Sequence, residues 1–193
     1  CTLLSPTSGT LSVDGYDVVQ QANEVRKRIG LVSEKLIMYP RLTALENLMF
    51  FGRLYRIDRN TLRKKSEELL EMVRLTQFKD KLVGGFSSGM RQRVNVIRAM
   101  LHDPDILFMD EPTTGLDPQS RRLVWDKIRS LRESGITIVL TTHYMDEADT
   151  LCDRVGIIDH GRVIALGTPA ELKARLGEET VVVARIKGAE RDA

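Results

Sequence analysis

Two adjacent carboxylates, Asp110 and Glu111, directly follow a short apolar run at residues 106–109. The run is predicted to form a strand buried on both faces. A buried parallel strand places its last side chains at the carboxyl edge of a sheet, where open α/β folds bind ligands. One acid there can hold Mg²⁺ beside a polyphosphate while the other orients a water for in-line attack. The pair therefore predicts phosphoryl-transfer chemistry, with a solvated Asp-Glu turn as the alternative.

Two further apolar runs, residues 29–32 and 136–140, are also predicted to be buried strands followed by polar residues. Glu34 comes just after the first run, and His143 comes just after the second. If the strands are parallel, both side chains lie at the same edge as Asp110. A single His is more often structural than functional, so this placement is what makes His143 a candidate.

A Ser-Ser-Gly turn made of Ser87, Ser88 and Gly89 opens a helix predicted to run to about residue 101. Small side chains, unpaired backbone N–H groups and the positive end of the helix dipole suit a bound anion. The alternative for this turn is a plain helix N-cap. Further along, Asp117 is predicted to cap another helix, which has Pro118 at its first position.

The elements that must position these residues indicate an α/β fold. Asp14-Gly15 predicts a hairpin, and residues 43–75 have helical periodicity without a strand, which indicates a helical insertion. Within that insertion, Thr43 and Glu46 form a predicted capping box. Residues 155–166 predict a second hairpin. We therefore expect a three-layer core with a mostly parallel sheet and an inserted helical subdomain.

Composition excludes several classes of protein. The 193 residues carry 29 basic and 27 acidic side chains, so the net charge of +2 gives no field that indicates nucleic acid. The basic clusters at residues 26–28 and 63–65 are expected to be solvated faces. Two cysteines cannot make a disulfide framework or a metal site by spacing. No apolar run approaches the roughly 18 residues needed to span a bilayer.

In order and spacing, these motifs resemble the ATP-binding-cassette (ABC) transporter ATPases, specifically those of drug and polymer exporters. Residues 86–90 resemble the cassette signature, 106–111 the Walker B strand, 115–117 the D-loop, and His143 the switch histidine. The resemblance covers about residues 10–176. It implies a P-loop NTPase-type fold and an ATPase that energises export through a separate membrane permease.

The resemblance also implies roles for single residues, with ATP and Mg²⁺ as the cofactors. It implies that Asp110 holds Mg²⁺ through water, that Glu111 polarises the hydrolytic water, and that His143 contacts the γ-phosphate. The implied location is cytoplasmic, peripheral on the inner face of the cell membrane through the permease.

The implied partners are a transmembrane permease subunit and a second ATPase subunit in a head-to-tail dimer, and no nucleic acid. In that dimer, Ser87, Ser88 and Gly89 are expected to bind the nucleotide of the opposite subunit. Asp117 is expected to cross the interface.

Three features depart from the family pattern. The phosphate-binding loop Gly-x-x-x-x-Gly-Lys-Ser/Thr (Walker A) does not occur: Gly84 and Gly89 have the glycine spacing, but Met90 and Arg91 follow. We therefore expect an N-terminally truncated chain, inactive alone, that lacks this loop and its strand from the middle of the sheet. Glu34 stands where the family usually has a glutamine that senses Mg²⁺, which makes it a nucleotide-site candidate. The signature reads Phe-Ser-Ser-Gly-Met in place of Leu-Ser-Gly-Gly-Gln.

The expected organisation has four segments. Residues 1–35 are a truncated core, and residues 36–85 are the helical subdomain up to the signature loop. Residues 86–176 hold the signature helix, Walker B strand, D-loop, switch histidine and C-terminal core. Residues 177–193, with a predicted strand at 180–186, begin a C-terminal extension.

Two other classes share these motifs. DNA-repair and chromosome-maintenance clamps carry a long coiled coil inside the cassette, whereas residues 30–85 are short and have no sustained heptads. The near-neutral charge also argues against DNA. Translation-associated cassettes are the other class, and residues 144–148 look more like the exporter pattern. A neighbouring permease gene would discriminate best, while the transported substrate is set by that permease.

Overall fold

The structure, a computed structural model, describes residues 2, 4–33, 35 and 37–175. The chain forms two compact units, Cys1–Glu147 and Ala148–Ala193. The strand predicted at residues 180–186 and the expected C-terminal extension lie outside the described residues. The helices and strands of the first unit are β1 (Ser12–Val13), β2 (Tyr16–Asp17), α1 (Ala22–Arg28), β3 (Ile29–Val32), α2 (Ala44–Leu54), α3 (Arg59–Met72), η1 (Thr76–Phe78), η2 (Val83–Gly85), α4 (Ser88–Ala99), β4 (Ile106–Asp110), α5 (Pro118–Glu133) and β5 (Thr137–Thr141).

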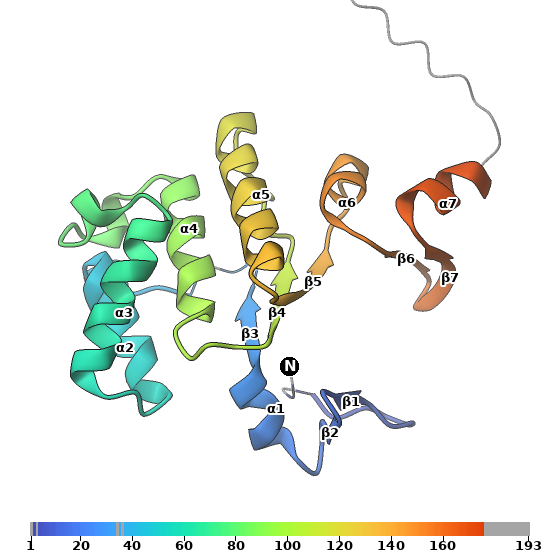
Figure 1. Cartoon of the computed structure of the whole chain (residues 1–193), viewed down its shortest axis with the longest axis horizontal. Helices are drawn as coiled ribbons and strands as arrows, with labels where there is room; N and C mark the ends of the chain where they lie inside the picture. Colours follow the sequence, from blue (N-terminus) through green and yellow to red (C-terminus); the bar gives the residue numbers. More distant parts are fainter. Residues whose placement is uncertain (1, 3, 34, 36, 176–193) are drawn as a thin grey trace, which may run out of the picture. The chain divides into compact units, whose positions relative to one another are not determined.

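The first hairpin has the turn that its sequence predicts. Asp14 and Gly15 both have positive φ, 50° and 79°, which is the requirement of a type I′ turn. The strands β1 and β2 pair antiparallel, and α1 then leads directly into β3 (Figure 1).

Strands β3, β4 and β5 form a parallel sheet in that order, which confirms the predicted parallel core. The register pairs Val32 with Met109 and Asp110 with Thr141, so the three strands end at one edge. The three strands are direct hydrogen-bonded neighbours. The gap expected in the middle of the sheet therefore does not lie between any two of them.

Strand β4 is packed on both faces, as predicted. Leu107 and Met109 are fully buried, while Ile106 and Phe108 pack against a cluster of Val18, Val25 and Ile29.

The strand predicted at residues 136–140 is present as β5, but the prediction that it is buried was wrong. In β5, Val139 is 43% exposed and alternate residues face outward. The reason is that, within the described residues, β5 is the last strand of its sheet and has only β4 beside it.

The helical stretch is confirmed as α2 and α3, which lie side by side (Figure 1). The predicted capping box begins α2: the Thr43 hydroxyl accepts from the Glu46 amide at 3.1 Å, and the Glu46 carboxylate accepts from the Thr43 amide at 2.8 Å. The two helices bury Leu48, Leu62 and Leu70 completely.

The second unit contains the second hairpin and a short helix. Its turn has His160 and Gly161 at positive φ, 45° and 73°. A capping box between Thr168 and Glu171 begins the helix. Helix α6 (Met145–Leu151) runs across the boundary of the two units, and the remaining elements are β6 (Val155–Asp159), β7 (Arg162–Gly167) and α7 (Pro169–Arg175).

Candidate active site

The site is built where β4 and β5 end together. Asp110 is the last residue of β4, and its register partner Thr141 is the last residue of β5. The Thr141 hydroxyl donates to Asp110 Oδ1 at 2.5 Å. The Glu111 amide in turn donates to the Thr141 carbonyl at 3.1 Å and reaches its hydroxyl at 3.3 Å. One threonine therefore fixes the carboxylate of Asp110 and the backbone of Glu111.

Glu111 is held in a defined orientation by two side chains. Its Oε2 atom accepts from the Thr114 hydroxyl at 2.7 Å and lies 2.9 Å from Nδ1 of His143. The hydrogen bond from Thr114, and then the one from His143, hold the pKa of Glu111 below its ordinary value. Since both partners stabilise the charged form, Glu111 is a carboxylate at neutral pH.

The backbone of Glu111 is strained. Its φ is +46°, in the left-handed region that residues other than glycine rarely adopt. Such strain persists only where surrounding contacts enforce it, and it concentrates at functional sites. Here the enforcing contacts are those of Thr141 to the amide and of Thr114 and His143 to the carboxylate.

The site is open to a ligand. The side chains of His143 and Glu111 are 56% and 32% exposed, and Asp110 is exposed as well. Among the described residues, the hydrogen bonds to the Glu111 carboxylate all go to Oε2. Oε1 is therefore the oxygen that can accept from a water.

The side chains present fit a magnesium ion whose remaining ligands are water and phosphate oxygens. In the described part of the chain, no three His, Cys, Asp or Glu side chains gather as a protein-only metal site. Mg²⁺ does not need one, because it is usually held by one or two carboxylates together with water and substrate phosphates. Asp110 supplies one exposed carboxylate at a strand end, next to Glu111.

The Ser-Ser-Gly turn begins α4. Ser87 is the N-cap, and its hydroxyl accepts from the Met90 amide at 3.2 Å, so the capping alternative holds for this side chain. Ser87 and Ser88 are exposed. Gly89 is buried, and a Cβ added there would come within 2.7 Å of the Ser120 hydroxyl. Packing within the chain is therefore sufficient to explain this glycine, and its contact with nucleotide stays a prediction.

Asp117 caps α5, as predicted. Its carboxylate accepts from the amides of Gln119 and Ser120 at 3.0 and 2.9 Å, and Pro118 follows at the first helical position. The hydrogen bond from the Ser120 side chain, followed by the backbone bonds, holds the pKa of Asp117 below its ordinary value. Its role in a dimer interface stays a prediction.

The candidate residues thus fall into two groups. Asp110, Glu111 and His143 meet at the strand edge. The turn at residues 87–89 and Asp117 lie at the N-termini of α4 and α5, which approach each other where Gly89 meets Ser120. Glu34 lies outside the described residues, so its role stays a prediction.

Three residues at or next to the site were not identified from the sequence. Thr141 could have been found from the strand register, because it pairs with Asp110. Thr114 stands three residues after Glu111 in a turn, a spacing that allows a side chain to bond back. Glu147, which is buried and bonded to Thr113, has no signal in the sequence because it looks like a surface acid of a short helix.

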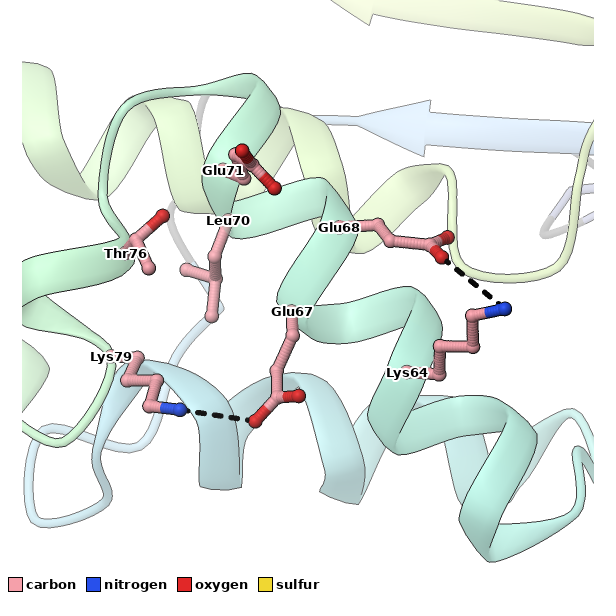
Figure 2. A pocket seen from close by; sticks show the side chains of 7 residues that line it. All are labelled: Lys64, Glu67, Glu68, Leu70, Glu71, Thr76 and Lys79. Carbon is pink, nitrogen blue, oxygen red and sulfur yellow. Dashed lines mark hydrogen bonds and ion pairs between the residues drawn. The ribbon is translucent and has the colours of Figure 1, made fainter.

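One cavity with a defined lining lies away from the candidate site. It has a volume of about 250 Å³ and is lined by α3 and the segment after it (Figure 2). Lys64 pairs with Glu68 at 3.9 Å and Lys79 pairs with Glu67 at 3.1 Å, so four of the five charged residues of the lining form opposite-charge pairs. No residue of the candidate site lines it. Arg63 and Lys64 are exposed and ion-paired, as expected for a solvated face, whereas the Lys65 side chain is only 18% exposed and pairs with Asp103.

None of the helices in the described part of the chain is both long enough and apolar enough to cross a bilayer.

Comparisons with known proteins show which family the chain resembles. The chain is 41% identical over 186 residues to the linearmycin resistance ATP-binding protein LnrL of Bacillus subtilis, covering 96% of this chain and 60% of the relative. It is 48% identical over 167 residues to the Nod factor export ATP-binding protein I of Ralstonia nicotianae, covering 86% and 52%. The chain thus spans between half and three fifths of the length of these curated relatives.

A solved structure has the same fold. It is the dimeric ATP-binding cassette MJ0796 in a post-hydrolysis state with ADP and Pi, with a TM-score of 0.76 and 28% identity. The match covers 87% of this chain and 76% of that one. The family model described as ABC transporter matches residues 1–114, more than half of the sequence. The strand β4 ends at Asp110, Glu111 follows it, and His143 lies beside Glu111. The chain that carries this arrangement belongs to the ABC transporter family.

Proposed function

We propose that this chain is part of an ATP-binding and ATP-hydrolysing subunit that energises export through a separate membrane permease. The observation that carries the proposal is the Glu111 carboxylate, which is ionised, fixed through Oε2, and open at Oε1, next to Asp110. The relatives named for linearmycin resistance and for Nod factor export support the transport direction.

The chemistry follows from the two acids. When bound, Mg²⁺ would neutralise charge on the phosphates, and Asp110 would hold it through water. Glu111 would accept a hydrogen bond from the attacking water at Oε1 and align it with the γ-phosphate. Hydrogen bonds hold the pKa of Glu111 below its ordinary value, so the side chain is ionised and its charge can polarise that water.

His143 would contact the γ-phosphate through its second ring nitrogen. Nδ1 faces the Glu111 carboxylate at 2.9 Å, so this nitrogen carries a proton when the contact is made. Nε2, on the other side of the ring, is then the atom that would face a phosphate oxygen.

The proposed partners are a permease and a second copy of the subunit. In a head-to-tail dimer, Ser87, Ser88, Gly89 and Asp117 would face the nucleotide of the other copy. The dimeric state of MJ0796 supports this arrangement. The proposed location is the inner face of the cell membrane, reached through the permease.

We further propose that these 193 residues alone neither bind ATP tightly nor hydrolyse it. The Gly-x-x-x-x-Gly-Lys-Ser/Thr loop that cradles the phosphates does not occur in them. Calorimetric titration with ATP and Mg²⁺ tests this. A dissociation constant below about 1 µM, equivalent to roughly 8 kcal/mol of binding, would contradict it.

The experiment that tests the function uses the full-length subunit. Glu111→Gln keeps the shape of the side chain but removes the charge that polarises the water. We expect turnover to fall by roughly 10²-fold or more while ATP affinity changes little. Glu133→Gln, an exposed acid at the end of α5, is the matched control and should keep wild-type turnover. Equal activity of the Glu111 variant and the control would refute the proposed role.

A further inference from the structure

Glu147 is a buried carboxylate for which the proposed chemistry has no direct use. It lies on α6, four residues after His143, and is 0% exposed. Its Oε1 atom accepts two hydrogen bonds, one from the Thr113 hydroxyl at 2.9 Å and one from Trp125 Nε1 at 2.8 Å.

The other oxygen of this carboxylate, Oε2, is buried and has no hydrogen-bond partner in the structure. Burying a polar oxygen without a partner is unfavourable, and most buried polar atoms in proteins are paired. A packed apolar side chain would serve stability at least as well at such a position. The two bonds to Oε1 are therefore the feature that requires an explanation.

The two bonds connect the three segments that carry the site. Thr113 is fully buried and stands two residues after Glu111 in the loop that follows β4. Trp125 is on α5, the helix capped by Asp117. Glu147 itself continues the segment that begins with His143. One carboxylate thus ties the Glu111 loop, the Asp117 helix and the His143 segment together.

We propose that Glu147 is a positioning residue that keeps Glu111 and His143 at contact distance. It holds Thr113, and the loop that Thr113 anchors keeps Thr114 bonded to Glu111. The same loop maintains the strained φ of Glu111, which relaxes when the loop is released. The expected effect on ATP turnover rests on the proposed function, whereas the expected effect on the position of the loop does not.

The first test measures position without using activity. Hydrogen exchange, read by mass spectrometry on the full-length subunit, reports the amides of Thr114 and Leu116, which bond within the loop. Glu147→Leu removes the oxygen that accepts both hydrogen bonds, and Thr113→Val removes one of the two donors. Both variants should speed exchange in residues 111–117 by about tenfold or more and leave α2 and α3 unchanged.

Two further variants control for packing. Glu147→Gln keeps an oxygen that can accept from both donors, so its exchange should stay near wild type. Trp125→Phe removes only the bond that does not involve the loop. We expect that variant to change exchange in the loop by less than about threefold, since the Thr113 bond remains.

The second test measures turnover of the same variants with ATP. A misplacement of about 1 Å at a reacting group can lower the rate by up to about 10²-fold, so turnover in Glu147→Leu should fall at least tenfold. ATP affinity should stay within about threefold of wild type. In a Glu111→Gln background, Glu147→Leu should have no further effect, because it acts through Glu111.

The outcomes separate the two proposals. Faster exchange confined to the loop, with rescue by Glu147→Gln and loss of turnover only when Glu111 is present, supports the positioning role. Unchanged exchange in residues 111–117 overturns it, whatever the activity. If the wild-type subunit hydrolyses no ATP, the proposed function fails. The exchange result still shows whether Glu147 holds residues 111–117 in place. If Glu147→Leu does not fold, Thr113→Val carries the same decision.

Discussion

Adding one methyl group at Gly52 should lower the free energy of unfolding, and a second substitution nearby should change the sign of that effect. Gly52 lies in α2, and a Cβ built there would be 2.2, 2.8 and 3.0 Å from Cδ1, Cδ2 and Cγ of Leu62. Leu62 is fully buried on α3, so it has little room to move. Gly52→Ala therefore places two opposing effects at one site.

The magnitudes decide which effect prevails. Replacing a helical glycine by alanine gains roughly 1 kcal/mol of helix propensity. Adding a methyl group to a filled core costs typically about 1–3 kcal/mol, and a 2.2 Å approach belongs at the upper end. We expect a net loss of about 1–2 kcal/mol in the free energy of unfolding, measured by urea denaturation followed by circular dichroism.

Leu62→Ala removes all three clashing atoms and reverses the sign. Alone it should cost about 2–5 kcal/mol because it opens a cavity. In that background Gly52→Ala should stabilise by about 1 kcal/mol, since only the propensity term remains. Gly85→Ala, where nothing lies within 4 Å of the added Cβ, should change stability by less than about 0.5 kcal/mol. A Gly52→Ala variant as stable as wild type would refute the packing argument.

Three further predictions address other elements. Thr43→Ala removes the capping box of α2 and should lower the free energy of unfolding by about 1 kcal/mol in urea titrations; no change would show that Glu46 alone caps the helix. Burial lowers the pKa of His102 below its unfolded value of 6.5, so stability should fall as pH drops below about 6.5. His102→Gln should flatten that fall, whereas His160→Gln, on an exposed turn, should not. Tyr39 is exposed just before α2, and we expect the permease to dock on this part of the helical stretch, so a cysteine variant at Tyr39 should crosslink to the cytoplasmic loops of the permease; failure at every loop would exclude docking there.

Much of the frame was predictable because local signals decide it. Asp14-Gly15 determines its turn through two positive φ values, and Thr43 with Glu46 begins α2 through its own hydrogen bonds. The meeting of Asp110 and His143 at one edge was predictable because each follows an apolar run. Parallel strands place the residues that follow them at the same edge of the sheet.

The rest depends on contacts between distant segments. An apolar run such as residues 136–140 cannot show how many neighbours a strand has, and β5 has only one among the described residues. The link from Thr141 to Asp110 depends on the sheet register, which the sequence does not state. Glu147 is buried only because Thr113 and Trp125 converge on it from other elements.

ATP-dependent dimerisation of the Glu111→Gln variant tests the central claim most directly. If Glu111 aligns the hydrolytic water at the strand edge, the full-length variant binds ATP but cannot turn it over, so ATP-bound dimers should accumulate. Size-exclusion chromatography with light scattering, with and without ATP and Mg²⁺, measures this. We predict a dimer with ATP and a monomer with ADP. Only monomers in ATP, or wild-type turnover in the variant, would contradict the role of Glu111.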